Sequence, residues 1–366
     1  MKKLNGLSLF ASGGISEYYF DKTNVQIKVA NELLSERCKF YNSLYPDVKM
    51  IEGNITNENI YNNILKESKK EEINFILATP PCQGMSKAGR MKVTDERNIL
   101  FVYILKLIKE LKPKYVLIEN VPEFLKFNYI NPETNKEERI IDKIYNDIEK
   151  DYNINSKILD AKYYEVPQSR KRAIILISRK DQKEWKIPNS ILDDNNLITV
   201  EQTIGHLPSL ESGEKYKGTD EYLKKWHNSK THNDKHILWM KNTPTGKSAF
   251  DNEIYYPKTI DKNTKEERRI KGFKTTYKRI NWNKPAPTIT MSSGSISSQN
   301  NVHPGRFIKK TNIWSDARVL TIYELILLTS LPTNLKIPNG TTDKNLRELF
   351  GECVPSKFMY NLIKNI

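Results

Sequence analysis

Residues 7–14 read LSLFASGG, an apolar strand pattern that runs directly into a glycine turn. A second strand pattern covers residues 25–29 and ends at Asn31 and Glu32. A glycine turn after a first strand, with an acid about 20 residues on after a second strand, is the layout of a Rossmann-type nucleotide site. Glu32 would then accept hydrogen bonds from ribose hydroxyls. Since glycines also serve ordinary tight turns, this layout needs support from the rest of the chain.

The turn differs from a dinucleotide site in one respect. The G-x-G-x-x-G fingerprint, which brings the backbone close to a pyrophosphate, is absent from residues 10–14. The turn therefore predicts a site for an adenosine group without phosphates. The same absence argues against a dinucleotide-dependent oxidoreductase.

Further strand patterns follow at residues 48–51, 73–78 and 116–119, with helical patterns between them. One helix is bounded on both sides, because Asp95 can cap its start and Pro113 stops it. Strands that alternate with helices predict an α/β fold with a parallel sheet covered on both faces. The carboxyl ends of such strands meet at one crevice, where ligands bind.

Two of these strand ends carry groups that can react. Residues 80–84 read PPCQG after the fourth strand, so Cys82 follows a buried strand and two prolines fix the backbone before it. Glu119 closes the fifth strand. Each has a plain alternative, since most free cysteines are buried small side chains and a glutamate can be an incidental edge charge. Together in one crevice, they predict a thiolate nucleophile and an acid.

Composition and charge narrow the class of protein. The chain has 366 residues, 38% hydrophobic and 28% charged, which fits a globular protein of about two domains. The 59 Lys and Arg residues exceed the 44 Asp and Glu residues by 15, and the pI is about 9.4. This excess favours a polyanionic partner, above all nucleic acid, although a lysine-rich solvated surface is the alternative.

The cysteines and the N-terminus bear on the compartment. Cys38, Cys82 and Cys353 show no metal-ligand spacing and cannot all pair, so we expect a reducing compartment and no metal site. The first residues, MKKLNGLSLF, lack the long apolar segment of a signal peptide, and no run approaches the length of a membrane span. These features predict an intracellular, cytoplasmic protein.

Through an ordered series of motifs, the chain resembles the DNA (cytosine-5)-methyltransferases, mostly bacterial modification enzymes. The matching segments are residues 10–14 as the first motif, PPCQ at 80–83 as the nucleophile motif, ENV at 119–121, QSRKR at 168–172, KPAPT at 284–288 and GECVP at 351–355. One such motif would not suffice, but their shared order leaves little room for coincidence. The resemblance implies a Rossmann-like, S-adenosylmethionine-dependent methyltransferase fold with a smaller, mixed target-recognition domain.

The family's chemistry would give catalytic roles to Cys82, Glu119 and Arg172. Cytosine is a poor nucleophile at carbon 5, so the Cys82 thiolate would add to carbon 6 and make carbon 5 react like an enamine. A protonated Glu119 would donate to ring N3, which requires a raised pKa in a closed site. Arg172 would hold the cytosine O2 and orient Glu119. For Arg170 and Arg172 the alternative is phosphate contact or surface charge, but the strand pattern at residues 173–177 ties them to the sheet.

The resemblance also implies where the methyl donor and the target base bind. Phe10 would pack on adenine, Glu32 would bind the ribose, and residues near Val354 would cover the site. The implied cofactor contacts are Phe10, Ala11, Ser12, Gly13, Gly14, Glu32, Leu33, Asn54, Ile55, Pro80, Leu100, Cys353 and Val354. The target cytosine would be flipped out of the duplex. The residues implied for the base and its backbone are Gln83, Ser86, Gln168 and Arg170.

The chain departs from the usual motifs at a few positions. The first motif is one residue short, with Ser12 near where a glycine is usual. Asn54 stands where an aspartate usually accepts from the adenine amino group, and its side-chain oxygen can still accept. Glu352 and Cys353 replace the Asn-Ala of the usual tenth motif. We expect altered cofactor contacts and unchanged chemistry.

The second half of the chain loses its apolar periodicity between Lys180 and about Asn281. We therefore expect a discontinuous catalytic domain over residues 1–180 and 315–366, and a target-recognition domain over 181–314. Residues 265–279 mix basic side chains with aromatic ones, as a surface that reads a DNA groove would, although a solvated loop is the alternative. The serine-rich residues 292–301 suit either a linker or a nucleic-acid contact. His303 is most simply structural.

The predicted function is methylation of double-stranded DNA by a monomer, with a cognate restriction endonuclease as a possible separate partner. One alternative is a tRNA cytosine methyltransferase on the same scaffold. Another is a catalytically silent DNA-binding paralogue, which the presence of Cys82, Glu119 and Arg172 argues against. The recognition sequence does not follow from these residues, because it depends on side-chain geometry and DNA shape.

Overall fold

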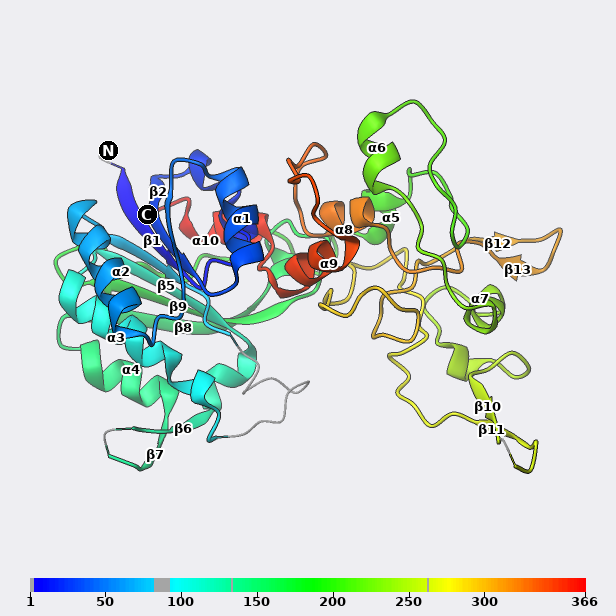
Figure 1. The fold of residues 1–366 in the computed structure, drawn as a ribbon, viewed down its shortest axis with the longest axis horizontal. Coiled ribbons are helices and arrows are strands. Elements are labelled where there is room, and N and C mark those ends of the chain that lie inside the picture. Colours follow the sequence, from blue (N-terminus) through cyan, green and yellow to red (C-terminus); the bar gives the residue numbers. More distant parts are fainter. Residues whose placement is uncertain (1–2, 82–92, 133, 262) are drawn as a thin grey trace.

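The computed structural model describes residues 3–81, 93–132, 134–261 and 263–366. Its centre is a seven-stranded sheet in the order β3-β2-β1-β4-β5-β9-β8 (Figure 1). The strands are β1 (Leu4–Leu9), β2 (Val25–Glu32), β3 (Lys49–Glu52), β4 (Phe75–Ala78), β5 (Tyr115–Asn120), β8 (Tyr152–Asp160) and β9 (Lys171–Arg179). The five strands predicted from the first 120 residues are therefore all present, within a few residues of their predicted bounds.

Strand β9 departs from the predicted parallel arrangement. Strands β1 to β5 pair in parallel, whereas β9 is antiparallel to both β5 and β8. The connection from β8 to β9 holds only the short 3-10 helix Ala161–Tyr163, and a short connection favours antiparallel pairing. The sheet is therefore mostly parallel, with one reversed strand that carries Arg172.

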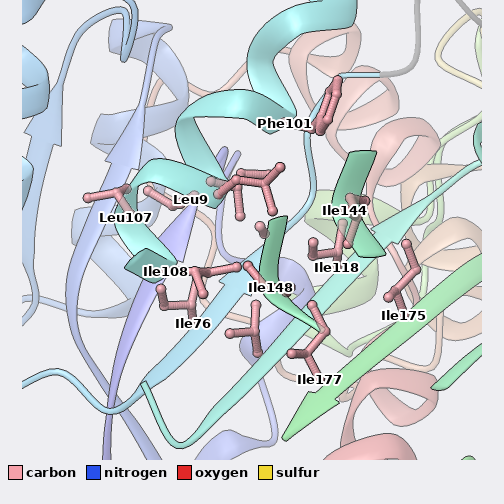
Figure 2. Packing of buried hydrophobic residues seen from close by; sticks show 14 of the residues in the cluster. Leu9, Ile76, Phe101, Leu107, Ile108, Ile118, Ile144, Ile148, Ile175 and Ile177 are labelled. Carbon is pink, nitrogen blue, oxygen red and sulfur yellow. The ribbon is translucent and has the colours of Figure 1, made fainter. Parts of the chain in front are cut away.

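Helices cover both faces of the sheet, as predicted. Helices α2 (Glu58–Lys70), α3 (Leu100–Leu111) and α4 (Ile140–Ile148) pack on one face, where Ile76, Ile118 and Ile175 point (Figure 2). The other face is covered by α10 (Ser356–Ile363) and Trp185. Alternate residues of β4 belong to the two clusters, because side chains alternate across a strand. A strand buried on both faces explains the unbroken apolar run there.

The start of α3 follows the predicted signals. The Asp95 carboxylate accepts from the backbone N of Arg97 at 3.0 Å, and a 3-10 turn over Glu96–Ile99 leads into the helix. The helix ends at Leu111, where Lys112 takes a left-handed conformation (φ 46°) before Pro113.

The second lobe has short helices and two-stranded ribbons, and Figure 1 shows it beside the sheet. Its elements are α5 (Val200–Ile204), α6 (Glu221–Trp226), α7 (Asp234–Lys241), β10 (Lys258–Ile260), β11 (Glu267–Arg269), β12 (Phe307–Ile308), β13 (Ile313–Trp314), α8 (Ile322–Leu328) and α9 (Asp343–Glu352). The remaining elements of the first half are α1 (Ser35–Leu44) and the ribbon of β6 (Asn128–Ile130) and β7 (Glu137–Arg139).

The C-terminal helices divide between the two lobes. Helices α8 and α9 share a hydrophobic cluster with α5 and with Trp282 and Ile289, whereas α10 packs on the sheet. Of the residues 315–366 that were assigned to the catalytic domain, α10 packs on the sheet, whereas α8 and α9 pack in the second lobe. The domain boundaries 1–180 plus 315–366 and 181–314 stay a prediction.

A buried ionic network stabilises the second lobe, where apolar periodicity is weak. The fully buried Arg318 donates to Glu324 through two nitrogens, each at 2.9 Å, and to Asp316 at 3.0 Å. Burial alone would raise the pKa of Glu324, but Arg318 and His303 lower it to about 2. Polar contacts thus replace part of the apolar core that the sequence pattern lacks. In the described part of the chain, no helix has the length and apolar character that a membrane span requires.

Candidate active site

The predicted site residues follow strands whose carboxyl ends meet at one edge of the sheet. Leu9 pairs with both Asn31 and Ala78, Ala78 pairs with Ile118, and Glu32 pairs with Glu52. The glycine turn, the residues after β2 and β3, the proline pair after β4 and the acid of β5 therefore lie along the same edge. A crevice at this edge is the position at which open α/β sheets bind ligands.

Glu119 and Arg172 form a buried ion pair. Arg172 Nε lies 2.8 Å from Glu119 Oε1, and the two side chains are 13% and 8% exposed. The antiparallel pairing of β5 and β9 brings them together, since Glu119 pairs with Ile174. Burial raises the pKa of Glu119, while Arg172 and Arg170 lower it. The predicted contact between Arg172 and Glu119 is present, and burial favours the neutral carboxyl.

Asn120 connects this acid to the segment that precedes Cys82. Its Nδ2 donates to the carbonyl oxygen of Pro80 at 2.9 Å, and its Oδ1 accepts from the backbone N of Val121 at 2.8 Å. Asn120 is 2% exposed, so these contacts are shielded from water. No role for Asn120 was predicted from the sequence, although it lies within the acid motif.

The nucleophile segment itself is only partly described. Cys82, Gln83 and Ser86 lie outside the described residues, and their predicted roles stay predictions. Pro80 is buried two residues before Cys82. Thr79 Oγ1 donates to the carbonyl oxygen of Phe10 at 3.1 Å, which ties the end of β4 to the first motif.

The glycine turn packs tightly against α1 and α9. Gly14 has a φ of 73°, and a Cβ there would lie 2.5 Å from Tyr45 and 2.8 Å from Tyr41. A Cβ on Gly13 would lie 2.6 Å from Leu349. Residue type is therefore restricted at both glycines by close approach and, at Gly14, also by backbone conformation.

Phe10, Ala11 and Ser12 form the rest of the turn. Phe10 and Ser12 have φ values of 58° and 49°, so the backbone turns sharply at both. Ala11 N donates to the carbonyl oxygen of Asn31 at 3.0 Å, which keeps the turn on β2. Ser12 N donates to Glu32 Oε2 at 2.8 Å, so the turn also contacts the acid predicted to bind ribose.

Glu32 and Leu33 have the chemistry that an adenosine group requires. Glu32 Oε1 accepts from the backbone N of Leu33 and of Leu34 at 2.8 and 2.9 Å, which fixes the carboxylate while leaving it further lone pairs. Leu33 is 58% exposed directly beside it. An exposed aliphatic side chain next to a fixed carboxylate suits an apolar ring joined to a ribose. These residues fit the cofactor that the resemblance implies.

Asn54 and Ile55 follow β3 at the same edge. Asn54 is exposed, and its Oδ1 accepts from the backbone N of Thr56 at 3.0 Å. The predicted acceptor oxygen is thus already in use, although a second lone pair and the amide nitrogen are available. Ile55 is 2% exposed and belongs to the main core.

The tenth motif lies against the first, as predicted. Val354 N donates to Ser16 Oγ at 3.3 Å, and Ser356 Oγ donates to the carbonyl oxygen of Ile15 at 2.6 Å. Cys353 is buried in the cluster that holds α8 and α9, and burial raises the pKa of its thiol to about 12. Its predicted contact with the cofactor stays a prediction. Leu100, another predicted cofactor contact, packs at the border of the main core.

Gln168 and Arg170 have structural contacts that the sequence analysis did not foresee. Both are buried. Arg170 donates to the carbonyl oxygens of Ile289, Gly351 and Glu352 at 3.0, 2.9 and 3.0 Å. Gln168 Oε1 accepts from the backbone N of Ile289 at 3.2 Å. These contacts favour a positioning role for both residues, and their predicted contact with the target base stays untested.

The motif around Arg170 is also joined to the KPAPT motif. Ser169 N donates to the carbonyl oxygen of Ala286, and Ala286 N donates to that of Pro167, both at 2.8 Å. Thr288 Oγ1 donates to the carbonyl oxygen of Ser169 at 2.8 Å. This joint connects the sheet to the second lobe directly beside Arg172.

Comparison with known proteins decides the class of this site. The sequence model of the C-5 cytosine-specific DNA methylases matches residues 4–366. The chain belongs to this family. It is 43% identical over 371 aligned positions to the type II methyltransferase M1.HgaI of Avibacterium volantium, covering 100% of this chain and 98% of that protein. It is 27% identical to the type II methyltransferase M1.HphI of Haemophilus parahaemolyticus, covering 90% and 78%.

Solved structures of other methyltransferases have the same fold as this cytosine methylase. The Entamoeba histolytica methyltransferase EhMeth aligns with a TM-score of 0.61 at 17% identity, covering 99% of this chain and 98% of that chain. The Dnmt2 methyltransferase of S. pombe aligns with a TM-score of 0.60 at 16% identity, covering 99% and 97%. The predicted fold class, family and enzyme class are confirmed, and the chain is a DNA (cytosine-5)-methyltransferase.

The second lobe of this methylase exposes basic and apolar side chains together. All three residues of strand β11, which include Arg268 and Arg269, are exposed, and Ile260 of the paired strand β10 is 49% exposed. Phe273 is 76% exposed. These residues lie in or beside the predicted groove-reading stretch 265–279, whose role stays a prediction. Residues 292–301 include Asn301, which is buried.

His303 is structural in its contacts. It is 6% exposed, and its Nδ1 accepts from the backbone N of Gly305 at 3.1 Å. Both ring nitrogens lie 3.7 Å from buried carboxylates, those of Asp316 and Glu324. Among the described residues, no cluster of His, Cys, Asp and Glu side chains is arranged to hold a metal ion.

Proposed function

We propose that the chain transfers a methyl group from S-adenosylmethionine to carbon 5 of a flipped cytosine in double-stranded DNA. The observation that carries this proposal is the buried pair of Glu119 and Arg172 beside the segment that leads to Cys82. Asn120 holds the carbonyl oxygen of Pro80 from the same strand end, so the acid and the nucleophile segment share one support.

The Cys82 thiolate adds to carbon 6 of the cytosine, and the electron pair of the 5,6 double bond moves toward ring N3. Glu119 in its neutral form donates a proton to N3 and so neutralises the ring. Arg172 holds Oε1 of Glu119, which leaves Oε2 to carry that proton. Burial of Glu119 raises its pKa and supports the neutral form.

Carbon 5 of the adduct is then the nucleophile for methyl transfer. When bound, S-adenosylmethionine supplies a methyl group on a positively charged sulfur. Glu32 and the exposed Leu33 would hold its adenosine part, and the turn from Phe10 to Gly14 would lie against it. As the methyl group passes to carbon 5, its bond to sulfur would break and S-adenosylhomocysteine would remain. A base removes the proton from carbon 5, the 5,6 double bond re-forms as Cys82 leaves as the thiolate, and the N3 proton returns to Glu119.

The partners follow from charge and from the relatives. The formal charge of +15 suits binding to a DNA backbone, and the exposed arginines of β11 supply part of this charge. The names of the bacterial relatives, type II methyltransferases, support a role in restriction and modification beside a separate endonuclease. We further propose that the enzyme acts as a monomer in the cytoplasm.

Labelled S-adenosylmethionine tests this function. The protein is incubated with unmethylated genomic DNA or with unmodified tRNA, alongside a Cys82→Ala variant, and 5-methylcytosine is mapped by sequencing. Label in DNA at one short motif, lost in the variant, is the expected result. Label in tRNA alone would favour the RNA alternative, and label in neither would favour a silent DNA-binding protein.

A further inference from the structure

Arg37 of α1 contacts the tenth motif beside the glycine turn, although no motif includes it. Its side chain is 6% exposed. Nη2 donates to Glu352 Oε2 at 3.2 Å, and Nε lies 2.8 Å from Glu352 Oε1, so one hydrogen bond and one close ionic contact join the guanidinium to the carboxylate. Nη2 also lies 3.6 Å from Glu348 Oε2. Arg37 therefore fastens α1 to the last turn of α9.

Glu352 connects this arginine to the glycine turn. Its Oε1 accepts from Ser12 Oγ, and Ser12 N donates to Glu32 Oε2 at 2.8 Å. The carbonyl oxygen of Glu352 accepts from Arg170 at 3.0 Å. A continuous series of contacts thus runs from Glu32, the acid predicted to bind ribose, through the turn and the tenth motif to Arg37.

Ser12 and Glu352 are also two of the positions at which the chain departs from the usual motifs. A glycine at position 12 has no hydroxyl to donate, and an asparagine at position 352 has no charge for Arg37. The two departures lie 340 positions apart in the sequence and contact each other directly.

We propose that Arg37 is a positioning residue for the cofactor, and that its ion pair with Glu352 holds the tenth motif against the glycine turn. The inference rests on the proposed use of S-adenosylmethionine. Ser12 and Glu352 form a compensating pair within this arrangement. Without Arg37, the Glu352 carboxylate lies near the Glu32 carboxylate with its main counter-charge removed, and like charges in a partly closed site repel. Residues 352–354 then lose their fixed position over the turn.

Electrostatic balance at Glu352 agrees with this role. Burial raises the pKa of Glu352, Arg37 and Ser12 lower it, and the charge of Glu32 raises it. Arg37 does not contact Glu119 or Arg172, so its effect should fall on binding of the cofactor and not on the chemical step. The alternative is that Arg37 only joins α1 to α9. Its removal would then lower stability without changing the affinity for the cofactor.

The test measures the dissociation constants of S-adenosylmethionine and S-adenosylhomocysteine by calorimetry for the full chain. We expect Arg37→Gln to bind both about tenfold more weakly, the size of effect expected from one lost charged contact. At saturating S-adenosylmethionine, kcat should stay within about twofold, since binding and chemistry separate in this way when only binding is affected. Arg37→Lys keeps the charge but loses the planar guanidinium, so its affinity should lie between those of Arg37→Gln and the wild type.

Arg179→Gln is the matched control. Arg179 also pairs with a carboxylate, that of Asp181, at 2.7 Å, but it lies at the end of β9 that is farther from Arg172 and the site. This variant should bind the cofactor as the wild type does. Ser12→Gly and Glu352→Asn test the compensation. The double variant should bind no more weakly than the weaker single variant, whereas factors that multiply would contradict the pairing.

The outcomes separate the inference from the function on which it rests. If the wild-type chain binds neither compound, the proposed cofactor is wrong and the inference fails with it. If the wild type binds and Arg37→Gln binds equally well, only the inference fails. Should Arg37→Gln not fold, Arg37→Lys and the Ser12 and Glu352 variants decide it by the same affinities.

Discussion

Replacing Glu119 by glutamine separates the chemical role of this side chain from its structural one. Glutamine has nearly the same shape, and its amide oxygen can still accept from Arg172 Nε, which lies 2.8 Å from the carboxylate in the wild type. It cannot transfer a proton to cytosine N3. The variant should therefore keep its fold and lose its reaction.

The two effects differ in size. The charged Arg172 can still donate to the amide oxygen, so only the attraction between opposite charges is lost, which costs stability of about 1 kcal/mol. The Glu119 side chain is 8% exposed, so its charge is costly to bury. An amide avoids this cost, which offsets part of the loss. Loss of general acid catalysis lowers the rate about 10²- to 10⁴-fold, or about 3–5 kcal/mol in the activation free energy. The rate should thus fall far more than stability does.

The assay combines single-turnover methylation of DNA with denaturant unfolding. The wild-type rate should also fall as pH rises through the pKa of Glu119, because the neutral carboxyl is the form that donates, and Glu119→Gln should lack that dependence. Asp147→Asn is the control, since Asp147 of α4 pairs with Lys109 of α3 and Lys143 of α4, on helices of the same lobe. A folded Glu119→Gln variant with a rate within about threefold of wild type would refute the proposed acid role.

Three further variants test the cofactor site, the buried acid Glu17 and the ionic network of Arg318. Leu33→Ala should weaken S-adenosylhomocysteine binding about five- to tenfold without changing stability, because the side chain is 58% exposed in the free protein; unchanged affinity would remove Leu33 from the site. Glu17 is buried, and burial raises its pKa from 4.5 to about 7, so the folded state keeps a proton that the unfolded state releases. Wild-type stability should therefore fall between pH 4.5 and about 7 by about 3 kcal/mol more than that of Glu17→Gln, and parallel pH curves would contradict this. Arg318→Met should cost about 3–5 kcal/mol in denaturant unfolding, because it leaves the carboxylates of Asp316 and Glu324 buried without their shared cation; wild-type stability would show that the network is dispensable.

The sequence predicted the parts of the fold that depend on local pattern. Strands β4 and β5 were found because apolar runs buried on both faces are distinctive. Strand β8 was missed, since residues 153–157 at the sheet edge are mostly polar and read as a loop. The reversed direction of β9 was not predicted either, because it depends on the connection between two strands, of which only one was recognised.

Part of the candidate site could also be predicted from the sequence. Ordered motifs placed Glu119 and Arg172 together, and their ion pair agrees. Arg170 was predicted to contact the target base, which stays untested; its hydrogen bonds to backbone carbonyls more than 100 positions away were not predicted. Arg37 had no signal at all, since its partner Glu352 is 315 positions distant. Contacts between segments so far apart are fixed by tertiary packing and leave no periodicity in the sequence.

The most direct test of the account uses DNA in which cytosine carries fluorine at carbon 5. Because fluorine cannot be removed as a proton, the Cys82 adduct should persist after methyl transfer. Intact-mass analysis and peptide mapping of the protein after incubation with this DNA and S-adenosylmethionine should show one methylated nucleotide attached at Cys82, and none in Cys82→Ala. Failure to form an adduct, or an adduct that remains in Cys82→Ala, would contradict the proposed mechanism.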